Sequence, residues 1–245
     1  MKPVALVPVY NHAATVGAVV QSLHELALPV ILVDDGSDAE CAAALDALAT
    51  ASATSLLRQP TNGGKGSAVI AGLREAHARG YSHALQLDAD GQHDAAVLPA
   101  FLDAMHAAPQ AVIASFPRYD VSVPTGRLLG RYATHVWVWI NTLSRRIRDS
   151  MCGLRIYPLA ATLPVLDAMP RESRMEFDTE ILVRLDWAGV PIHNLPIPVR
   201  YPPDGVSHFR LWRDNARISW MHTRLFFGML RRLPWLLGRH FSGQR

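Results

Sequence analysis

The sequence predicts an α/β fold with a mostly parallel, Rossmann-like sheet flanked by helices, and three observations support this. Short apolar runs alternate with stretches of helical spacing, which is typical of a parallel sheet covered on both faces. Acidic residues follow two of the apolar runs. The 245 residues, 49% hydrophobic and 18% charged, suit one globular α/β domain or one such domain with an appendage.

The first half of the chain alternates predicted strands and helices in a regular order. The predicted strands share a short apolar run and are 4–9, 30–35, 55–58, 83–88 and 111–115. The predicted helices share apolar residues three or four positions apart and are 16–26, 40–49, 66–80 and 96–107. Gly80 gives the third helix a natural C-terminal stop.

The second half is less regular. An aromatic stretch with helical spacing covers about 127–146, and a further helix is predicted at 177–188. A proline-rich extended segment follows at 190–203. The C-terminal region is predicted to be helical and broken at Pro234, because proline removes a backbone donor and its ring crowds the preceding turn.

Carboxylates are concentrated where two predicted strands end. Asp34 and Asp35 end one strand, and Asp88 and Asp90 end another, with Gln92 close behind. In open α/β sheets ligands bind beyond the carboxyl ends of the strands. Hard oxygen ligands suit Mg²⁺ or Mn²⁺, which complete their shells with water and substrate phosphates. Helix capping is the alternative explanation for each acid taken singly.

Several classes of protein are disfavoured by what the sequence lacks. No G-x-G-x-x-G follows the first strand, and the glycine-rich turn at 62–66 does not have P-loop spacing. No nucleic-acid-binding module is recognisable. No apolar run approaches the roughly 18 residues of a spanning helix, and no signal peptide is expected. Cys41 and Cys152 are too few for a disulfide framework, which favours a cytoplasmic location.

Six segments in order resemble glycosyltransferase family 2, and most of all its dolichyl-phosphate mannose synthase and polyprenyl-phosphate glycosyltransferase branch. They are VPVYN (7–11), VDDGS (33–37), NGGKGSAV (62–69), LDADGQ (87–92), RDSMCGLR (148–155) and GVSHFR (205–210). The resemblance covers roughly 4–215 and implies a GT-A domain, assigned to 1–209. It also implies inverting transfer of a hexose from a UDP- or GDP-sugar to a lipid-linked acceptor of the bacterial cell envelope, either a polyprenyl phosphate or a lipid hydroxyl.

The same resemblance assigns site residues. Donor-binding residues are Pro8, Tyr10, Asp35, Lys65 and Asp88, and the metal ligands for Mg²⁺ or Mn²⁺ in the DxD-type motif are Asp88, Asp90 and Gln92. Acceptor-binding residues are Arg118, Arg127, Arg131 and Ser207, where guanidinium forks suit phosphate. Catalytic candidates are Asp88, Asp149 and Glu180. A lipid phosphate is already ionised and needs no base, so Asp149 is a candidate base only for a hydroxyl acceptor.

The chain departs from the family pattern at His12, where the family commonly has Glu, and in its tail, 210–245. The tail interleaves arginines with Trp220, Leu225, Phe226 and other apolar residues. Such a helix can lie peripherally on an anionic membrane, at the inner face of the cytoplasmic membrane, or pack on the domain. Two other functions remain open: a nucleotidyltransferase, and a non-catalytic protein that binds a sugar nucleotide.

Overall fold

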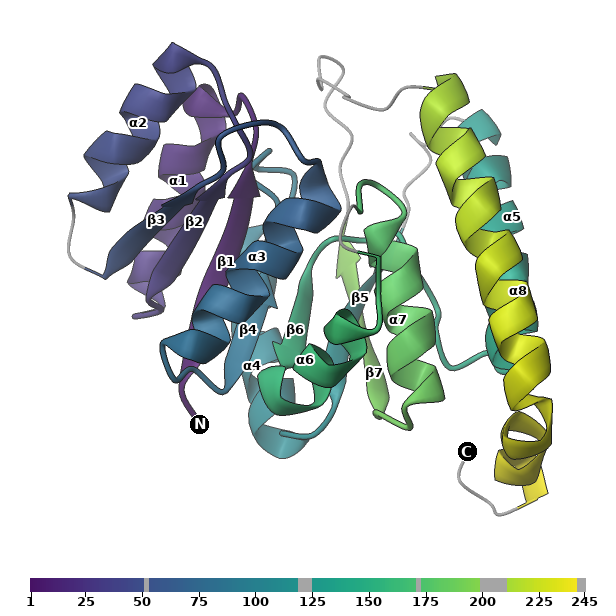
Figure 1. Cartoon of the computed structure of the whole chain (residues 1–245). Helices are drawn as coiled ribbons and strands as arrows, with labels where there is room; N and C mark the ends of the chain where they lie inside the picture. Colours follow the sequence, from purple (N-terminus) through teal and green to yellow (C-terminus); the bar gives the residue numbers. More distant parts are fainter. Residues whose placement is uncertain (51–52, 119–124, 171–172, 199–210, 242–245) are drawn as a thin grey trace.

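The centre of the molecule is a seven-stranded sheet with the order β3-β2-β1-β4-β6-β5-β7 (Figure 1). The computed structural model describes the chain except for residues 51–52, 119–124, 171–172, 199–210 and 242–245. The strands are β1 (Pro3–Val9), β2 (Val30–Asp34), β3 (Thr54–Arg58), β4 (His83–Gln86), β5 (Val112–Arg118), β6 (Arg155–Pro158) and β7 (Ile192–Pro198). β6 runs antiparallel to both neighbours, and the other strand pairs of the described chain are parallel. The predicted mostly parallel α/β fold is confirmed.

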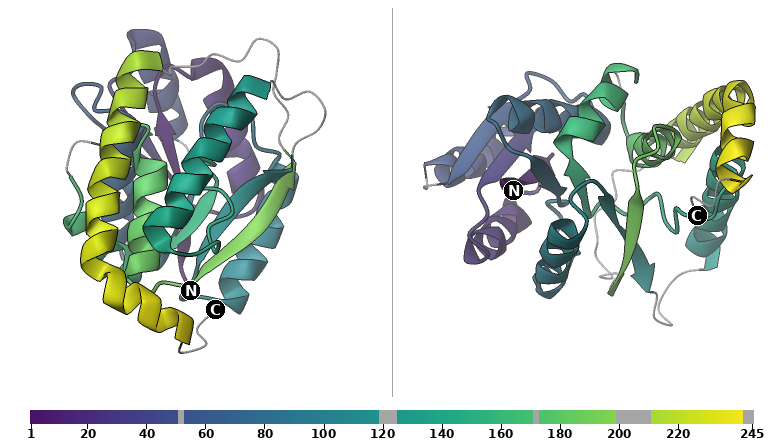
Figure 2. Two further views of the ribbon diagram at one scale, coloured as in Figure 1. Left: turned by 90° about the vertical axis from the view of Figure 1, so that its right-hand side faces the viewer. Right: turned by 90° about the horizontal axis from the view of Figure 1, so that it is seen from below.

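Helices cover both faces of the sheet, which is why its central strands are almost wholly apolar. One face carries α1 (Ala13–Glu25), α2 (Ala39–Ala49) and α4 (Leu98–Ala107), and the other carries α3 (Lys65–Ala78), α6 (Leu159–Asp167) and α7 (Phe177–Trp187) (Figure 2). Val4 and Leu6 of β1 pack on the α3 side, whereas Ala5 and Val7 pack on the α1 side. This alternation is the period of two expected of a strand buried on both faces.

The segments after β1, β2 and β4 all leave the sheet at the carboxyl ends of these parallel strands. We call this end of the sheet its carboxyl edge. Val9 pairs with Asp34 at the last position of the β1–β2 register, and the Leu87 amide donates to the carbonyl of Leu6 beside it. Because parallel strands end together, residues far apart in sequence meet at this edge. The acidic segments predicted to form a site therefore share one edge of the sheet.

Two elements of the second half were not predicted. β6 has four residues and begins with Arg155, whose side chain is fully buried, so a charge interrupts its apolar run. The next helix, α6, contains Pro164. A proline at an interior position normally disfavours the prediction of a helix. The predicted break at Pro234 is wrong: α8 (Leu211–Phe241) continues through it and changes direction in its last turns (Figure 2). A proline inside a helix removes one backbone hydrogen bond and crowds the preceding turn, which commonly bends the helix without ending it.

An outer layer of two helices, α5 (Thr125–Thr142) and α8, lies beyond α7 (Figures 1 and 2). Met221, Leu225, Met229 and Leu236 of α8 are buried toward the rest of the molecule. This confirms that one face of the predicted tail packs on the domain, because residues four apart share a helix face. Within the described residues, no helix is both long enough and apolar enough to cross a membrane.

The opposite side of this layer exposes large apolar side chains, which we call the aromatic face. Its members are more than a third exposed and are Tyr132, Val136, Trp137 and Ile140 of α5 and Trp212, Trp220, Phe227, Leu230, Trp235 and Leu237 of α8. Arg213, Arg231 and Arg232 are also exposed on α8. So many exposed large apolar side chains on two neighbouring helices indicate an interaction surface.

Candidate active site

The glycine-rich turn before α3 is held by a buried carboxylate. Asp35 accepts hydrogen bonds from the amides of Gly63 and Gly64, both at 2.8 Å. Burial raises the pKa of Asp35, although these two hydrogen bonds oppose that shift. Gly64 has φ +94°, a conformation that favours glycine. Asp35, predicted to contact the base of the donor, thus also fixes the turn that carries Lys65.

Lys65, the first residue of α3, bridges two carboxylates. Its Nζ lies 2.8 Å from Oδ1 of Asp88 and 3.0 Å from Oδ2 of Asp178. Burial by itself would lower the pKa of Lys65, but Asp178 and Asp88 outweigh that effect and raise it. The side chain is therefore a cation at the carboxyl edge of the sheet, and its predicted contact with the nucleotide donor stays a prediction.

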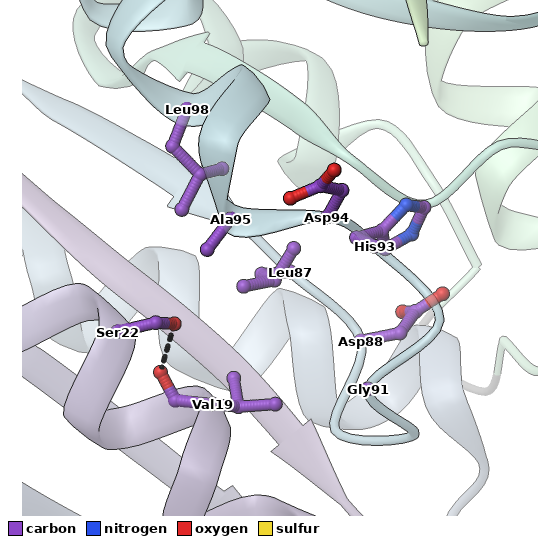
Figure 3. Close-up of a pocket in the computed structure, with 9 residues that line it drawn as sticks. All are labelled: Val19, Ser22, Leu87, Asp88, Gly91, His93, Asp94, Ala95 and Leu98. Carbon is purple, nitrogen blue, oxygen red and sulfur yellow. Dashed lines mark hydrogen bonds between the residues drawn. The ribbon is translucent and has the colours of Figure 1, made fainter. Parts of the chain in front are cut away.

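The segment after β4 turns tightly over α1. Oδ1 of Asp90 accepts from the Gln92 amide at 3.0 Å, and Gly91 has φ +70°. Figure 3 shows Asp88 and His93 extending from this turn, beside a small cavity whose other side includes Val19 of α1. Burial lowers the pKa of His93 despite the two nearby carboxylates, so its imidazole is neutral at pH 7.

The residues predicted to hold a metal have suitable oxygen ligands and can be reached from solvent. Asp88, Asp90 and Gln92 supply hard oxygens on one turn, and Asp88 and Asp90 are both partly exposed. Gly153 lies against the Asp88 carboxylate, because a Cβ there would come within 2.8 Å of Oδ1. In the described part of the chain no three His, Cys, Asp or Glu side chains converge on one point. Substrate oxygens and water would have to complete the shell, as Mg²⁺ commonly requires.

A single buried arginine ties the 148–155 segment to this network. The Arg155 guanidinium donates to the carbonyls of Ser150 at 2.6 Å, Cys152 at 3.0 Å and Asp178 at 2.6 Å. Since the side chain is fully buried, each of these bonds replaces a lost bond to water. Arg155 thereby fixes the loop that presents both Asp149 and Gly153.

Asp149 is paired with Arg131, one of the predicted acceptor-binding residues. Nε and Nη2 of Arg131 on α5 lie 2.6 and 2.7 Å from its two carboxylate oxygens, a bidentate fork. Oδ1 also accepts from the amides of Met151 and Cys152, both at 2.8 Å. Burial would raise the pKa of Asp149, but Arg131 dominates and lowers it. The structure therefore joins two of the predicted site residues.

The other acceptor candidates are only partly described. Arg118 ends β5 and is exposed. Arg127 lies on α5, but its side chain, like the whole of Ser207, lies outside the described residues. On the donor side, Pro8 is buried in β1 and Tyr10 is partly buried directly after it. The roles assigned to these five residues thus stay predictions from their positions in the sequence.

Glu180, predicted as catalytic, lies in a different cluster. It is buried on α7, with Arg184 Nη2 2.7 Å from Oε1 and Arg224 Nη2 of α8 3.0 Å from Oε2. Both oxygens are thus engaged in joining α7 to α8. These contacts indicate a structural role, and a catalytic one stays a prediction without geometric support.

Three residues of the site were missed. Asp178 and Arg155 carry ion pairs at its centre, and His93 lies beside Asp88 with an Nδ1 that has no hydrogen-bond partner among the described residues. His93 follows the metal motif directly, so its position was a usable signal. Asp178 is 90 residues from Asp88 and lies inside a helix, where an acid carries no pattern of its own.

The sheet, its carboxylate-bearing edge and the flanking helices define a GT-A type glycosyltransferase fold. Residues 4–162 match the family described as Glycosyl transferase family 2, and this chain belongs to that family. The predicted family and the predicted fold class are both confirmed.

Named relatives and solved structures agree with this assignment. The chain is 30% identical over 214 residues to the undecaprenyl-phosphate mannosyltransferase of Micrococcus luteus, covering 80% of this chain and 83% of that protein. It is also 30% identical over 173 residues to the polyprenol monophosphomannose synthase of Mycolicibacterium smegmatis, covering 64% of this chain but only 61% of the synthase.

A solved structure with the same fold is glucosyl-3-phosphoglycerate synthase from Mycobacterium tuberculosis in complex with Mn²⁺ and UDP-glucose. Its TM-score is 0.64 at 17% sequence identity, and the match covers 94% of this chain and 78% of that chain. At this identity the likeness concerns the fold alone.

Proposed function

We propose that this protein transfers a sugar from a nucleotide-diphospho sugar to a polyprenyl phosphate at a membrane surface, with inversion at the anomeric carbon. The observation that carries the proposal is the bidentate ion pair between Arg131 and Asp149. Arg131 directly precedes Tyr132 of the aromatic face. An arginine on α5 and an apolar surface on the same helix suit an acceptor with a charged head and a long hydrocarbon chain. Two relatives are named for polyprenol or undecaprenyl phosphate, which supports the same acceptor class.

The donor would bind at the carboxyl edge of the sheet. Pro8, Tyr10 and Asp35 would border the nucleoside, while Asp88, Asp90 and Gln92 would hold Mg²⁺ or Mn²⁺. Such an ion, when bound, offsets the charge of the nucleoside diphosphate as it leaves. Lys65 adds a fixed positive charge at the same edge.

The state of Asp149 favours a phosphate acceptor over a hydroxyl. A general base needs an available carboxylate oxygen and a pKa near the working pH. Both oxygens of Asp149 are held by Arg131, and its pKa is lowered. A phosphate oxygen is already ionised and attacks the anomeric carbon without a base. We therefore assign Asp149 the task of orienting Arg131 toward the acceptor.

The aromatic face would bring the enzyme to its lipid substrate. Exposed Trp and Phe side chains with neighbouring arginines are what an interfacial helix needs to lie on anionic lipid. Tyr132 and Val136 of this face lie one residue and five residues after Arg131, so lipid at the face would be close to the acceptor arginine. Cys41 and Cys152 are both free, as in a reducing compartment, which fits the inner face of the cytoplasmic membrane.

Product analysis with a labelled nucleotide sugar tests the proposal. UDP- and GDP-sugars would be incubated with the protein, Mn²⁺ and a short polyprenyl phosphate. Release of the nucleoside diphosphate together with a labelled glycolipid is expected. Release of pyrophosphate would indicate a nucleotidyltransferase instead. An unchanged donor that nevertheless stabilises the protein would indicate a sugar-nucleotide-binding protein without catalysis.

A further inference from the structure

The carboxylate predicted to hold the metal is already engaged by a cation of the protein. Lys65 Nζ lies 2.8 Å from Oδ1 and 3.0 Å from Oδ2 of Asp88, so it contacts both oxygens. Lys65 and Lys2 are the only lysines in the sequence, and Lys2 lies at the opposite end of β1. A flexible ammonium on a four-carbon stem can move between acceptors more easily than a guanidinium fork.

A second carboxylate is fixed beside the first. Oδ2 of Asp178 lies 3.0 Å from Lys65 Nζ, and its other oxygen faces Gln86 Nε2 at 3.3 Å and Arg155 Nη1 at 3.6 Å. Gln86 and Arg155 are fully buried, so Asp178 is held by an immobile frame. Lys65 thus has one acceptor within the predicted metal motif and one outside it.

We infer that Lys65 is a built-in counter-cation that occupies Asp88 until a nucleoside diphosphate arrives with its divalent ion, and that Asp178 keeps Lys65 in the site afterwards. The inference rests on the proposed function, because it assumes that Asp88 is a metal ligand. The ammonium and the divalent ion carry the same sign and compete for one carboxylate. A diphosphate adds negative charge that both cations can share, so metal and nucleotide bind cooperatively.

Manganese titration of the whole protein tests this competition. The signal of free Mn²⁺ in electron paramagnetic resonance would be followed with Mn²⁺ alone and again with UDP or GDP present. Wild type should bind Mn²⁺ weakly alone and much more tightly with the nucleotide. Lys65→Gln should bind Mn²⁺ alone at least about tenfold more tightly, because a like charge beside the ligand is gone. The added effect of the nucleotide should shrink correspondingly.

Two control variants separate direct competition from a general change in charge. Lys2→Gln removes the other lysine, and Arg174→Gln removes a cation that binds Asn62 in the same glycine-rich turn without contacting Asp88. Without nucleotide, both should bind Mn²⁺ as wild type does. Melting followed by circular dichroism verifies that each variant is folded, and Lys65→Met provides a second neutral side chain if Lys65→Gln is not.

Asp178 is a positioning residue that acts through Lys65, and a double-mutant cycle tests that role. Asp178→Asn should weaken Mn²⁺ binding with nucleotide in the wild-type background, because Lys65 then relies on Asp88 alone. The same change in the Lys65→Gln background should have a much smaller effect. An equal effect in both backgrounds would show that Asp178 acts on the ion through space.

The outcomes distinguish this inference from the proposed function. If wild type binds Mn²⁺ with nucleotide but Lys65→Gln binds Mn²⁺ alone no more tightly than wild type does, the counter-cation role of Lys65 is wrong and the proposed function is untouched. If neither protein binds Mn²⁺ even with UDP or GDP, the metal site itself is wrong and both ideas fall.

Discussion

Two regions of the molecule meet at the 148–155 segment, and they are built in different ways. The donor region, which takes its name from the proposed function, comprises the edge after β1, β2 and β4 with the glycine-rich turn. Buried polar contacts hold it, such as those of Asp35 and of Lys65. The acceptor region, also named for the proposed function, comprises α5 and α8, which are joined mainly by apolar contacts and expose the aromatic face.

The difference teaches how each region suits its ligand. Short polar contacts fix side chains to within a fraction of an ångström, which a small charged ligand requires. A helix that buries one apolar face and exposes another needs no such fixed points and suits a broad lipid surface. Arg155 and the Asp149–Arg131 fork connect the two. Away from these connecting residues, each region has its own set of contacts, so we expect a change in one region to alter mainly one binding event.

The largest effect is expected in the donor region. Mutation of a residue that only hydrogen-bonds a metal ligand costs roughly 10- to 100-fold in activity. Asp90→Ala removes a proposed ligand itself and should reduce transfer by more than this. It should weaken donor binding with Mn²⁺ more than with a chelator, because a carboxylate acting through a metal matters only when the metal is present. Calorimetric titration with the nucleoside diphosphate measures binding in both conditions. Equal losses in the two would remove Asp90 from the metal site.

Two substitutions on α8 compare its buried and exposed faces. Leu225→Ala removes a fully buried side chain and should cost about 2–5 kcal/mol of unfolding free energy. Trp220→Ala removes a side chain that is 63% exposed and should leave stability nearly unchanged while lowering sedimentation with anionic vesicles. Denaturant unfolding and vesicle sedimentation supply the two readouts. A Trp220 variant that binds vesicles like wild type would contradict a lipid-facing α8.

The contact between α5 and α8 should make the acceptor region sensitive to acid. His222 of α8 contacts Asn141 Nδ2 at 3.3 Å, and burial lowers its pKa from 6.5 to about 4. Between these values the unfolded chain takes up a proton that the folded protein does not. His222 therefore lowers stability as pH falls through this window, by at most about 3 kcal/mol, and the loss stops below the folded pKa.

A neutral substitute at this position isolates the effect. The unfolding free energies of wild type and His222→Gln would be compared by denaturant unfolding between about pH 7 and about pH 4.5. The variant should lose less stability than wild type over this range. Parallel pH profiles would mean that His222 is protonated in the folded protein as readily as in the unfolded chain.

The smallest effect is expected at the fork. Arg131→Ala should lower kcat/KM for polyprenyl phosphate by about 10- to 100-fold, the range of a charged hydrogen bond. Donor binding should change much less, since the fork joins Arg131 to Asp149, which is not one of the predicted donor-binding residues. Arg131→Lys keeps the charge without the fork and should recover part of the loss. Weaker binding of the nucleoside diphosphate in the alanine variant would contradict the division into two regions.

The donor region was the easier one to predict from the sequence. Asp35 and Asp88 lie within two residues of a strand end and Lys65 opens a helix, so the ends of the elements placed them at one edge. Their partners were harder to predict. Asp178 reaches Lys65 only because α7 packs beside α3, which depends on the tertiary packing of two distant segments.

The C-terminal part of the acceptor region, α8, was predicted as an amphipathic helix, but spacing alone did not show which side faces the protein. Leu225 and Trp220 were both interpreted as one apolar face, whereas the structure buries the first and exposes the second. When a helix has apolar residues on two sides, its sequence does not determine which side is buried until the neighbouring elements are known. Arg155 was missed for a related reason, because the sequence does not distinguish a buried arginine from an exposed one.

Transfer to two lipids that differ only in the phosphate tests the central claim most directly. Vesicles would contain either polyprenyl phosphate or the polyprenol of the same chain length, with a labelled nucleotide sugar and Mn²⁺ in solution. Because Asp149 is occupied by Arg131 and has a lowered pKa, the account predicts glycolipid from the phosphate and none from the alcohol. Equal transfer to both lipids, or transfer to the alcohol alone, would contradict it.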